Sequence, residues 1–325
     1  MDTSLSEFPS LEMLTVGLTS ALRENGRALE QVTVIDREPA VTASTFPSEI
    51  VTCRIDAGKV QQLYCKYAIG YGHASEDHRR GLAYEAEVYR NVLQPLETTT
   101  PAFCGAYSDS TTGDTWLILE YLDQSMPLNQ IDEPAPILGA AARWIGEFHS
   151  RNERRLATTA MPSLVAYDAE YYFGWARRTS LFAGDLRGRY PWVEVVCRDY
   201  EKLVDLLLMR PATIIHGEFE SDNLLLRDGV LYPVDWESAA IAVGEMDLAR
   251  LTWGWPAEIA ARCELEYQRA RWPEGAPADF GRRVAAARLY LPLRFLGERA
   301  DWTIQESSAE LFEELRSAGV ELELI

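Results

Sequence analysis

The amino-acid sequence predicts an α+β protein with a small sheet region up to residue 122 and a mainly helical region from residue 123 to residue 325. Short apolar and β-branched runs, typical of strands, dominate the first third of the chain. In the rest of the chain, apolar residues recur mostly at the spacing of amphipathic helices. Between the two regions, residues 123–136 contain three prolines and little apolar periodicity, which is typical of a connector.

The sheet region is predicted to begin with a helix over residues 10–25. Leucines recur there every three or four residues, Ser10 is in position to cap the first turn, and Gly26 is in position to end the helix. Residues 56–59 are predicted as the turn of a hairpin, and residues 109–114 as a polar loop. The strands are expected at residues 31–35, 49–55, 62–67, 102–107 and 115–121, and a second helix at residues 79–94.

The helical region is predicted to be interrupted once, at residues 213–234. In that stretch two short apolar runs, typical of strands, surround a group of polar residues. The helices are expected at residues 137–150, 168–183, 192–209, 245–253, 257–271, 278–299 and 303–317.

Composition and charge exclude several classes of protein. With 31 basic and 50 acidic residues the formal net charge is −19, which leaves too few clustered Lys and Arg for a nucleic-acid-coating protein. A hydrophobic content of 47% argues against a disordered chain. No run reaches the ~18 apolar residues of a membrane-spanning helix. The five cysteines are far apart and no secretory signal is visible, so we expect reduced thiols in a cytoplasmic protein.

The polar residues within the stretch 213–234 suit metal and proton chemistry. The segment HGEFESDN at residues 216–223 lies between apolar anchors, and a second apolar run ends at Asp235, twelve residues after Asn223. Oxygens of Asn and Asp are ligands that Mg²⁺ takes, and a further carboxylate, that of Glu218, would remain to act as a base. Considered alone, the segment has a second interpretation, which is a polar turn between two strands.

The spacing of this segment resembles that of the aminoglycoside phosphotransferase and choline kinase superfamily. The family motif is HGDxxxxN followed by an aspartate, and this chain has HGExxxxN followed by Asp235. Two weaker motifs occur in the family order, IGEFH at residues 145–149 and GEMDLA at residues 244–249. The resemblance covers residues 40–250. It implies a two-lobed protein-kinase-like fold, with a small antiparallel-sheet lobe that binds nucleotide and a mainly helical lobe that binds the acceptor.

The resemblance also implies which residues bind nucleotide and metal. Asn223 and Asp235 would hold Mg²⁺ against the phosphates of ATP. Lys66, in the apolar segment LYCKY, matches the strand lysine that contacts the α and β phosphates, and Glu85 or alternatively Glu87 would pair with it. The chain contains only three lysines, which weakens the alternative that Lys66 is an edge-strand lysine reaching for solvent.

Two further segments match nucleotide-contacting parts of the family. LILEYL at residues 117–122 resembles the hinge strand, where the backbone around Glu120 and Leu122 would hydrogen-bond adenine. The segment TASTFPS at residues 42–48 lies where protein kinases have a glycine-rich loop. Ser44 and Ser48 would contact phosphate there through hydroxyl and backbone N–H groups, and a simple turn between two strands is the alternative.

The chain departs from the family motif at Glu218, which replaces the catalytic aspartate. Glutamate keeps the carboxylate and sets it one methylene further out, and phosphoryl transfer depends mainly on positioning and charge stabilisation. We therefore expect Glu218 to act as the general base. The alternative is a nucleotide-binding pseudokinase or regulatory module without turnover. A protein kinase fits less well, because the HGE segment and the helical-lobe motifs resemble the small-molecule branch.

Neighbouring polar residues are expected to support this site. His149 and His216 would hold the structure through hydrogen bonds rather than transfer protons. Asp247 would either support the loop or form an ion pair with Arg250 or another arginine of the helical region, and Glu237 would make supporting contacts.

The expected acceptor is a hydroxyl group of a small molecule, such as an aminoglycoside, a sugar or an amino alcohol. Aromatic residues gather in the helical region, where they either pack helices together or, beside carboxylates, hold a cationic amine. The acidic net charge would attract a cationic acceptor. No nucleic-acid or membrane partner is expected.

Overall fold

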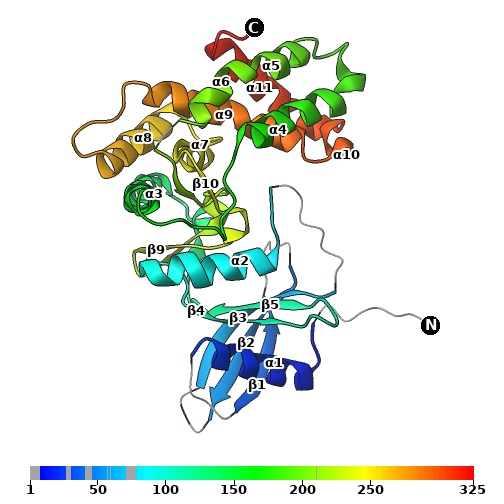
Figure 1. Ribbon diagram of the computed structural model, residues 1–325, viewed down its shortest axis with the longest axis vertical. Coiled ribbons are helices and arrows are strands. Elements are labelled where there is room, and N and C mark those ends of the chain that lie inside the picture. The colour runs from blue at the N-terminus through cyan, green and yellow to red at the C-terminus, as the bar shows by residue number, and fades with distance from the viewer. Residues whose placement is uncertain are drawn as a thin grey trace. The chain divides into compact units, whose positions relative to one another are not determined.

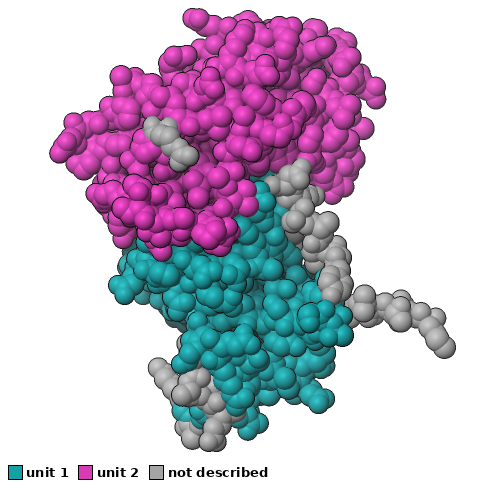
Figure 2. Space-filling view, in the orientation of Figure 1, with its two compact units in different colours: residues 1–127, 224–238 teal, residues 128–223, 239–325 magenta. Residues whose placement is uncertain are grey.

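The computed structural model of the chain describes residues 8–26, 31–40, 46–56, 58, 60–70, 78–209 and 211–325. The chain forms two compact units, shown in different colours in Figure 2. Unit 1 comprises residues 1–127 and 224–238, and unit 2 comprises residues 128–223 and 239–325. Residues 224–238 therefore group with the N-terminal part of the chain. The division into lobes at residue 122 stays a prediction.

Unit 1 is built on an antiparallel sheet (Figure 1). Its strands are β1 (Val32–Pro39), β2 (Ser48–Ile55), β3 (Val60–Ala68), β4 (Phe103–Ser108) and β5 (Thr115–Glu120). They lie in the order β1-β2-β3-β5-β4, so β3 is the central strand. The predicted antiparallel sheet is confirmed. Of the hairpin turn expected between β2 and β3, residues 57 and 59 lie outside the described residues.

The helix α1 (Leu11–Glu24) packs against β1 and β4 with its leucine face buried. The Ser10 side chain accepts a hydrogen bond from the backbone N of Met13 at 3.2 Å, which confirms the predicted cap. The approach of α1 to β4 is so close that a Cβ at Gly105 would lie 2.4 Å from the carbonyl oxygen of Ala21. Glycine is therefore required at this position of the sheet.

The helix α2 (Leu82–Val88) contacts β3 and β5. It begins after Gly81, whose φ of 78° is left-handed, and so starts later than the predicted residue 79. The chain continues in helical form as a π-helical turn at Tyr89–Leu93 and a 3₁₀ turn at Gln94–Leu96. The predicted helix is thus present, with an altered hydrogen-bond pattern in its second half.

A second sheet completes unit 1. It contains β6 (Met126–Pro127), β8 (Leu224–Arg227) and β9 (Val230–Pro233) in the order β6-β8-β9. The turn between β8 and β9 consists of Asp228 and Gly229, with φ of 52° and 77°, as expected for a two-residue type I′ hairpin. A 3₁₀ turn at Trp236–Ser238 follows β9. The strand-like runs predicted around residues 224 and 232 are present, whereas β6 was not predicted.

Unit 2 is mainly helical, as predicted. Two short strands, β7 (Thr213–Ile215) and β10 (Ala240–Ala242), pair antiparallel within it. Its helices are α3 (Ala135–Leu156), α4 (Ala169–Phe182), α5 (Val193–Asp199), α6 (Glu201–Leu207), α7 (Glu245–Thr252), α8 (Ala257–Arg271), α9 (Phe280–Leu296), α10 (Ala300–Thr303) and α11 (Ala309–Glu321).

The helix α9 lies at the centre of unit 2 and contacts α4, α6, α7 and α11. Most of its side chains are buried, unlike those of the amphipathic α3 and α8. No helix among the described residues is long and apolar enough to cross a membrane.

Two helix predictions are corrected by the structure. The helix predicted at residues 192–209 is divided into α5 and α6 at the buried Tyr200. The helix predicted at residues 303–317 is instead α10, a 3₁₀ turn at Glu306–Ser308, and α11. Hydroxyl groups account for the second interruption, because Thr303 and Ser308 donate to the carbonyls of Leu296 and Trp302 and so compete with helical hydrogen bonds.

Candidate active site

Lys66 lies on the central strand β3, opposite Ser48 on β2 and Leu117 on β5. The residue is only 5% exposed, so the alternative of an edge-strand lysine reaching for solvent is wrong. Its Nζ lies 3.0 and 3.2 Å from the carboxylate oxygens of Glu85 on α2. It also lies 2.6 Å from Oδ1 of Asp235. Three segments far apart in sequence therefore meet at one buried cation.

The electrostatics of this cluster favour a charged lysine. Burial acts to lower the pKa of Lys66, but the carboxylates of Asp235 and Glu85 outweigh it and place that pKa well above its ordinary value. Burial raises the pKa of Glu85, and the neighbouring ammonium of Lys66 opposes that rise. The ammonium group therefore stays positive at neutral pH and is fixed in position by two side chains.

The backbone around Asp235 is fixed in an uncommon conformation. Asp235 follows β9 with a φ of 68°, in the left-handed region that few non-glycine residues adopt. The next backbone N, of Trp236, donates to Oε1 of Glu85 at 3.2 Å, and the indole of Trp236 donates to the carbonyl of Pro233 at 3.1 Å. Unusual backbone held in this way is characteristic of ligand-binding sites.

The structure distinguishes the two candidate partners of the lysine. Glu85 is fully buried and contacts Lys66 with both carboxylate oxygens. Glu87 lies on the surface, where it forms an ion pair with Arg90 and accepts a hydrogen bond from Asn91 at 2.6 Å.

Carboxyl side chains outnumber basic side chains around Lys66. Glu237 is buried, and its Oε1 lies 3.8 Å from the guanidinium of the partly exposed Arg79. Burial, followed by repulsion from Asp235 and Glu85, raises the pKa of Glu237 to about 8. Among the described residues, no group of three or more His, Cys, Asp or Glu is arranged to hold a metal ion. Because Mg²⁺ bound to phosphates needs only one or two carboxylate ligands, the carboxylate of Asp235, which is 25% exposed, fits a phosphate-bound cation.

In unit 2, the HGE segment directly follows β7 and is fixed by its backbone. Asp247 on α7 accepts hydrogen bonds from the backbone N of His216 at 2.7 Å and of Gly217 at 2.8 Å. The backbone N of Glu218 donates to Nδ1 of His216 at 3.3 Å. His216 therefore holds the loop through backbone contacts, and Asp247 supports the loop.

Arg250, the alternative partner expected for Asp247, pairs with a different carboxylate. Arg250 forms an ion pair with Glu220, and no arginine among the described residues pairs with Asp247. Instead, Nε2 of the fully buried His149 lies 3.1 Å from Asp247.

His149 links the GEMDLA segment, which contains Asp247, to Tyr267 on α8. The other ring nitrogen of His149 lies 3.0 Å from the hydroxyl of Tyr267. Burial lowers the pKa of His149, and its hydrogen bond to Asp247 offsets this only in part, so the imidazole is neutral. A Cβ at Gly244 would lie 2.4 Å from the His149 ring. Gly244 thus leaves room for the His149 ring, while Asp247 holds the HGE loop.

Glu218 and Asn223 meet within unit 2. The side-chain amide nitrogen of Asn223 donates to the backbone carbonyl of Glu218 at 3.0 Å. This bond leaves the side-chain oxygen of Asn223 as the acceptor that can bind a ligand. Phe219, between them in sequence, is buried and stacks on Trp144 of α3 with 5.9 Å between ring centroids. The loop is therefore anchored both by hydrogen bonds and by an apolar contact.

One residue at this site was missed by the sequence analysis. Arg294 on α9 places Nη2 3.5 Å from Oε1 of Glu218, and both side chains are at least 98% buried. No motif spacing links two residues that are 76 positions apart. A signal was nevertheless present, because Arg294 interrupts the apolar run LYLPLRFL at residues 289–296.

The remaining predicted site residues lie in unit 1 or outside the described residues. Ser48 is buried on β2. Glu120 ends β5, and its backbone N donates to the carbonyl of Ala102 at 2.9 Å, while Leu122 is buried just beyond the strand. Ser44 lies outside the described residues. The structure thus brings together Lys66, Glu85 and Asp235 in unit 1.

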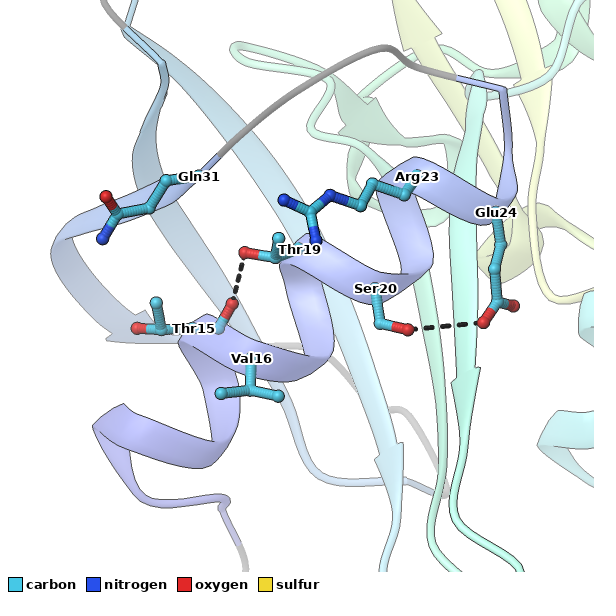
Figure 3. A pocket seen from close by; sticks show the side chains of 7 residues that line it. All are labelled: Thr15, Val16, Thr19, Ser20, Arg23, Glu24 and Gln31. Carbon is cyan, nitrogen blue, oxygen red and sulfur yellow. Dashed lines mark hydrogen bonds between the residues drawn. The ribbon is translucent and has the colours of Figure 1, made fainter.

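A surface hollow of 440 Å³ lies beside α1 (Figure 3). Its hydroxyl groups are used within the helix itself, since Thr19 donates to the carbonyl of Thr15 at 2.7 Å and Ser20 to Glu24 at 3.3 Å. None of the predicted site residues that the structure describes lines it. The hollow is therefore not a candidate active site.

Solved structures of small-molecule kinases share the fold of this chain. An amicoumacin kinase in complex with AMP-PNP, Ca²⁺ and amicoumacin is 10% identical, with a TM-score of 0.61 over 98% of this chain and 94% of that one. The choline kinase LicA from Streptococcus pneumoniae is 12% identical, with a TM-score of 0.60 over 89% and 94%. A putative fructosamine-3-kinase from Haemophilus somnus 129PT is 13% identical, with a TM-score of 0.58 over 93% and 96%. The predicted kinase-like fold is confirmed.

Sequence comparison assigns the family. No curated protein matches the chain. The model of a phosphotransferase enzyme family matches residues 74–287, which is more than half of the 325 residues and includes the HGE and GEMDLA segments. The predicted resemblance is therefore confirmed, and the chain belongs to the phosphotransferase enzyme family.

Proposed function

We propose that this phosphotransferase moves the γ-phosphate of ATP, with Mg²⁺, to a hydroxyl group of a small molecule. The observation that carries the proposal is the buried cluster of unit 1, in which Lys66 lies within 2.6–3.2 Å of Glu85 and Asp235. A positive group this well held in a chain of net charge −19 suits a polyphosphate, which such a protein would otherwise repel.

The residues of unit 1 would bind the nucleotide. Lys66 would contact the α and β phosphates, while Glu85 keeps the ammonium in place. The backbone around Glu120 and Leu122 would hydrogen-bond adenine, and Ser44 and Ser48 would contact phosphate. The amicoumacin kinase of similar fold was solved with AMP-PNP and Ca²⁺, which supports the use of a nucleotide together with a divalent cation.

The metal-binding proposal rests on Asp235 and Asn223. Both offer oxygen ligands, and the carboxylate of Asp235 is 25% exposed beside the buried ammonium of Lys66. When bound, Mg²⁺ would neutralise charge on the phosphate oxygens. Asn223 is oriented by its bond to the Glu218 carbonyl, so its ligand oxygen would be presented by the same loop that carries the base.

Glu218 would act as the general base. The acceptor oxygen forms a bond to the γ-phosphorus, the bond from that phosphorus to the β,γ-bridging oxygen breaks, and ADP leaves with the bonding electron pair. The acceptor hydroxyl loses its proton to the carboxylate of Glu218. A strong base is not needed, because positioning and charge stabilisation supply most of the rate.

The proposed acceptors are aminoglycosides, sugars and amino alcohols. The solved structures of similar fold include kinases of amicoumacin and choline and a putative fructosamine-3-kinase, which supports a small hydroxylated acceptor. The negative net charge favours cationic members of this set by long-range attraction.

The proposal is tested by a turnover screen of the full chain with MgATP. ADP release and phosphorylated product are measured with choline, ethanolamine, kanamycin and glucose. In the variant Asp235→Asn, which keeps the shape and removes the charge, transfer is expected to fall about 100- to 1,000-fold.

Asp228→Asn is the matched control, because Asp228 lies in the β8–β9 hairpin that precedes Asp235, is also at positive φ, and is exposed. Its transfer rate is expected to stay within about twofold of wild type. Transfer that is equal in wild type and in Asp235→Asn would contradict the proposed site.

A further inference from the structure

Arg294 is a buried arginine that contacts two carboxylates. Its Nη2 lies 3.5 Å from Oε1 of Glu218, and its Nη1 lies 3.3 Å from Oε2 of Glu298, one turn further along the chain. Arg294 is 2% exposed, and the two glutamates are 1% and 8% exposed. Charges removed from water to this extent are stable only when they are paired. The guanidinium is therefore fixed between the two carboxylates rather than free to turn.

The platform that carries Arg294 is itself well anchored. The hydroxyl of Thr179 on α4 donates to the carbonyl of Leu293 at 2.6 Å. Arg178, also on α4, donates to the carbonyl of Glu298 at 2.7 Å. The carbonyls on both sides of Arg294 thus bond to α4. Because the guanidinium is planar and presents its N–H groups in a rigid fork, fixing one arm on Glu298 also fixes the arm that faces Glu218.

The backbone of Glu218 is held separately from its carboxylate. Its backbone N donates to His216 and its carbonyl accepts from Asn223, so these bonds fix the position of the Glu218 backbone. The 3.5 Å contact with Arg294 fixes the position of the carboxylate. Shortening the side chain by one methylene would withdraw the carboxylate by about 1.5 Å, out of ion-pair range of Arg294. Glutamate at position 218, where the family motif has aspartate, is therefore long enough to contact Arg294, whereas aspartate is not.

We propose that Arg294 is a positioning residue for phosphoryl transfer, which holds the carboxylate of Glu218 in the orientation that accepts the proton of the acceptor hydroxyl. This inference rests on the proposed function. It assigns to Glu298 the task of orienting Arg294, and it gives the reason why glutamate serves at position 218 of this chain.

A double-mutant cycle between Arg294 and Glu218 tests the inference. Arg294→Met and Glu218→Asp are each expected to lower kcat about 100-fold, the cost of a misplacement of about 1 Å. If the two residues act as a unit, the double variant should lose about as much as either single variant, rather than their product of about 10,000-fold. The KM for ATP should stay within about twofold, because the lysine cluster belongs to unit 1.

Two further variants keep the test decisive if Arg294→Met does not fold. Arg294→Lys keeps the charge but lacks the fork, so kcat should fall about tenfold and again show coupling to Glu218→Asp. Arg283→Lys is the matched control, because Arg283 is a buried arginine on the same helix that pairs with Asp279. Its kcat should stay within about twofold of wild type, whatever its effect on the unfolding temperature.

The outcomes separate this inference from the proposed function. If wild type shows acceptor-dependent turnover but the losses in kcat multiply in the double variant, the inference about Arg294 is overturned and the proposed function stands. A kcat within twofold of wild type in Arg294→Lys and Arg294→Met would overturn the inference in the same way. Absence of turnover with every acceptor in the wild-type chain would overturn the proposed function and the inference together. Coupled losses in kcat, without a change in the KM for ATP, are the result that we expect.

Discussion

Lys66 in unit 1 and Arg294 in unit 2 are each buried between two carboxylates, and the two arrangements differ in kind. In unit 1, Lys66 contacts Glu85 and Asp235 at 2.6–3.2 Å, and both partners come from other elements of the unit. In unit 2, Arg294 contacts its partners at 3.3–3.5 Å, and one of them, Glu298, lies on the next turn of the chain. Lysine is a compact charge suited to phosphate oxygens, whereas arginine is a rigid fork suited to orienting a carboxylate. We therefore propose that Lys66 binds phosphate and that Arg294 positions the carboxylate of Glu218.

The largest effect on stability is expected from the variant Lys66→Met. It would leave the carboxylates of Glu85 and Asp235 without their cation, one of them fully buried. Breaking a buried pair in this way lowers the free energy of unfolding by about 3–5 kcal/mol, measured by urea denaturation. Lys202→Met, at an exposed lysine, should change it by less than about 0.5 kcal/mol. A loss below about 1 kcal/mol in Lys66→Met would show that the cluster is not a buried pair.

The next largest effect is expected from Asp247→Asn. The carboxylate accepts hydrogen bonds from two backbone N–H groups of the HGE loop and lies 3.1 Å from His149. An amide group cannot accept all of them, so the free energy of unfolding should fall by about 2–3 kcal/mol, with a lower kcat. Asp205→Asn, on the exposed face of α6, is the control. Unchanged stability and kcat in Asp247→Asn would exclude its role in holding the loop.

The two cations also differ in how far the sequence predicted them. Lys66 stood out because lysine is rare in this chain and interrupts an apolar strand, and family spacing gave its role. Arg294 interrupts an apolar helix in the same manner, but arginines are common in this chain and its partner Glu218 is 76 residues away. Periodicity predicted both the sheet and the helical unit. It could not predict which residues of different helices meet, because that depends on the packing of α9 against its neighbours.

A third, smaller effect is expected from pH. Burial lowers the pKa of His149 in the folded protein, whereas in the unfolded chain it lies near 6.5. Below about pH 6.5 the unfolded chain therefore binds a proton that folded His149 does not, and stability falls as pH falls. The slope from this residue is at most about 1.4 kcal/mol per pH unit.

The variant His149→Gln isolates that contribution, because glutamine does not titrate. Unfolding free energies of both proteins between pH 5 and pH 7.5 give the difference curve. We expect the wild type to lose more stability than the variant as pH is lowered. Parallel curves would mean that His149 titrates normally in the folded state.

The smallest effect is expected from Glu87→Gln. The side chain of Glu87 is 45% exposed, and among the described residues it pairs with Arg90 and Asn91 in the turn that follows α2. Its loss should therefore cost less than about 0.5 kcal/mol and leave kcat within about twofold. Glu85→Gln, two residues earlier, removes a charge from the Lys66 cluster and should raise the KM for ATP. Equal effects of the two variants would contradict the pairing of Lys66 with Glu85.

The most direct test of the account is acceptor-dependent ADP release in wild type and in Glu218→Gln. Both are assayed with MgATP and with choline, ethanolamine, kanamycin or glucose, and nucleotide affinity is measured for each protein. We expect wild type to turn over with at least one acceptor. We also expect Glu218→Gln to lose about 100- to 10,000-fold in kcat, as for the loss of a general base, and to bind ATP as tightly as wild type. Equal turnover in the two proteins, or nucleotide binding without turnover in wild type, would exclude Glu218 as the general base of a phosphotransferase.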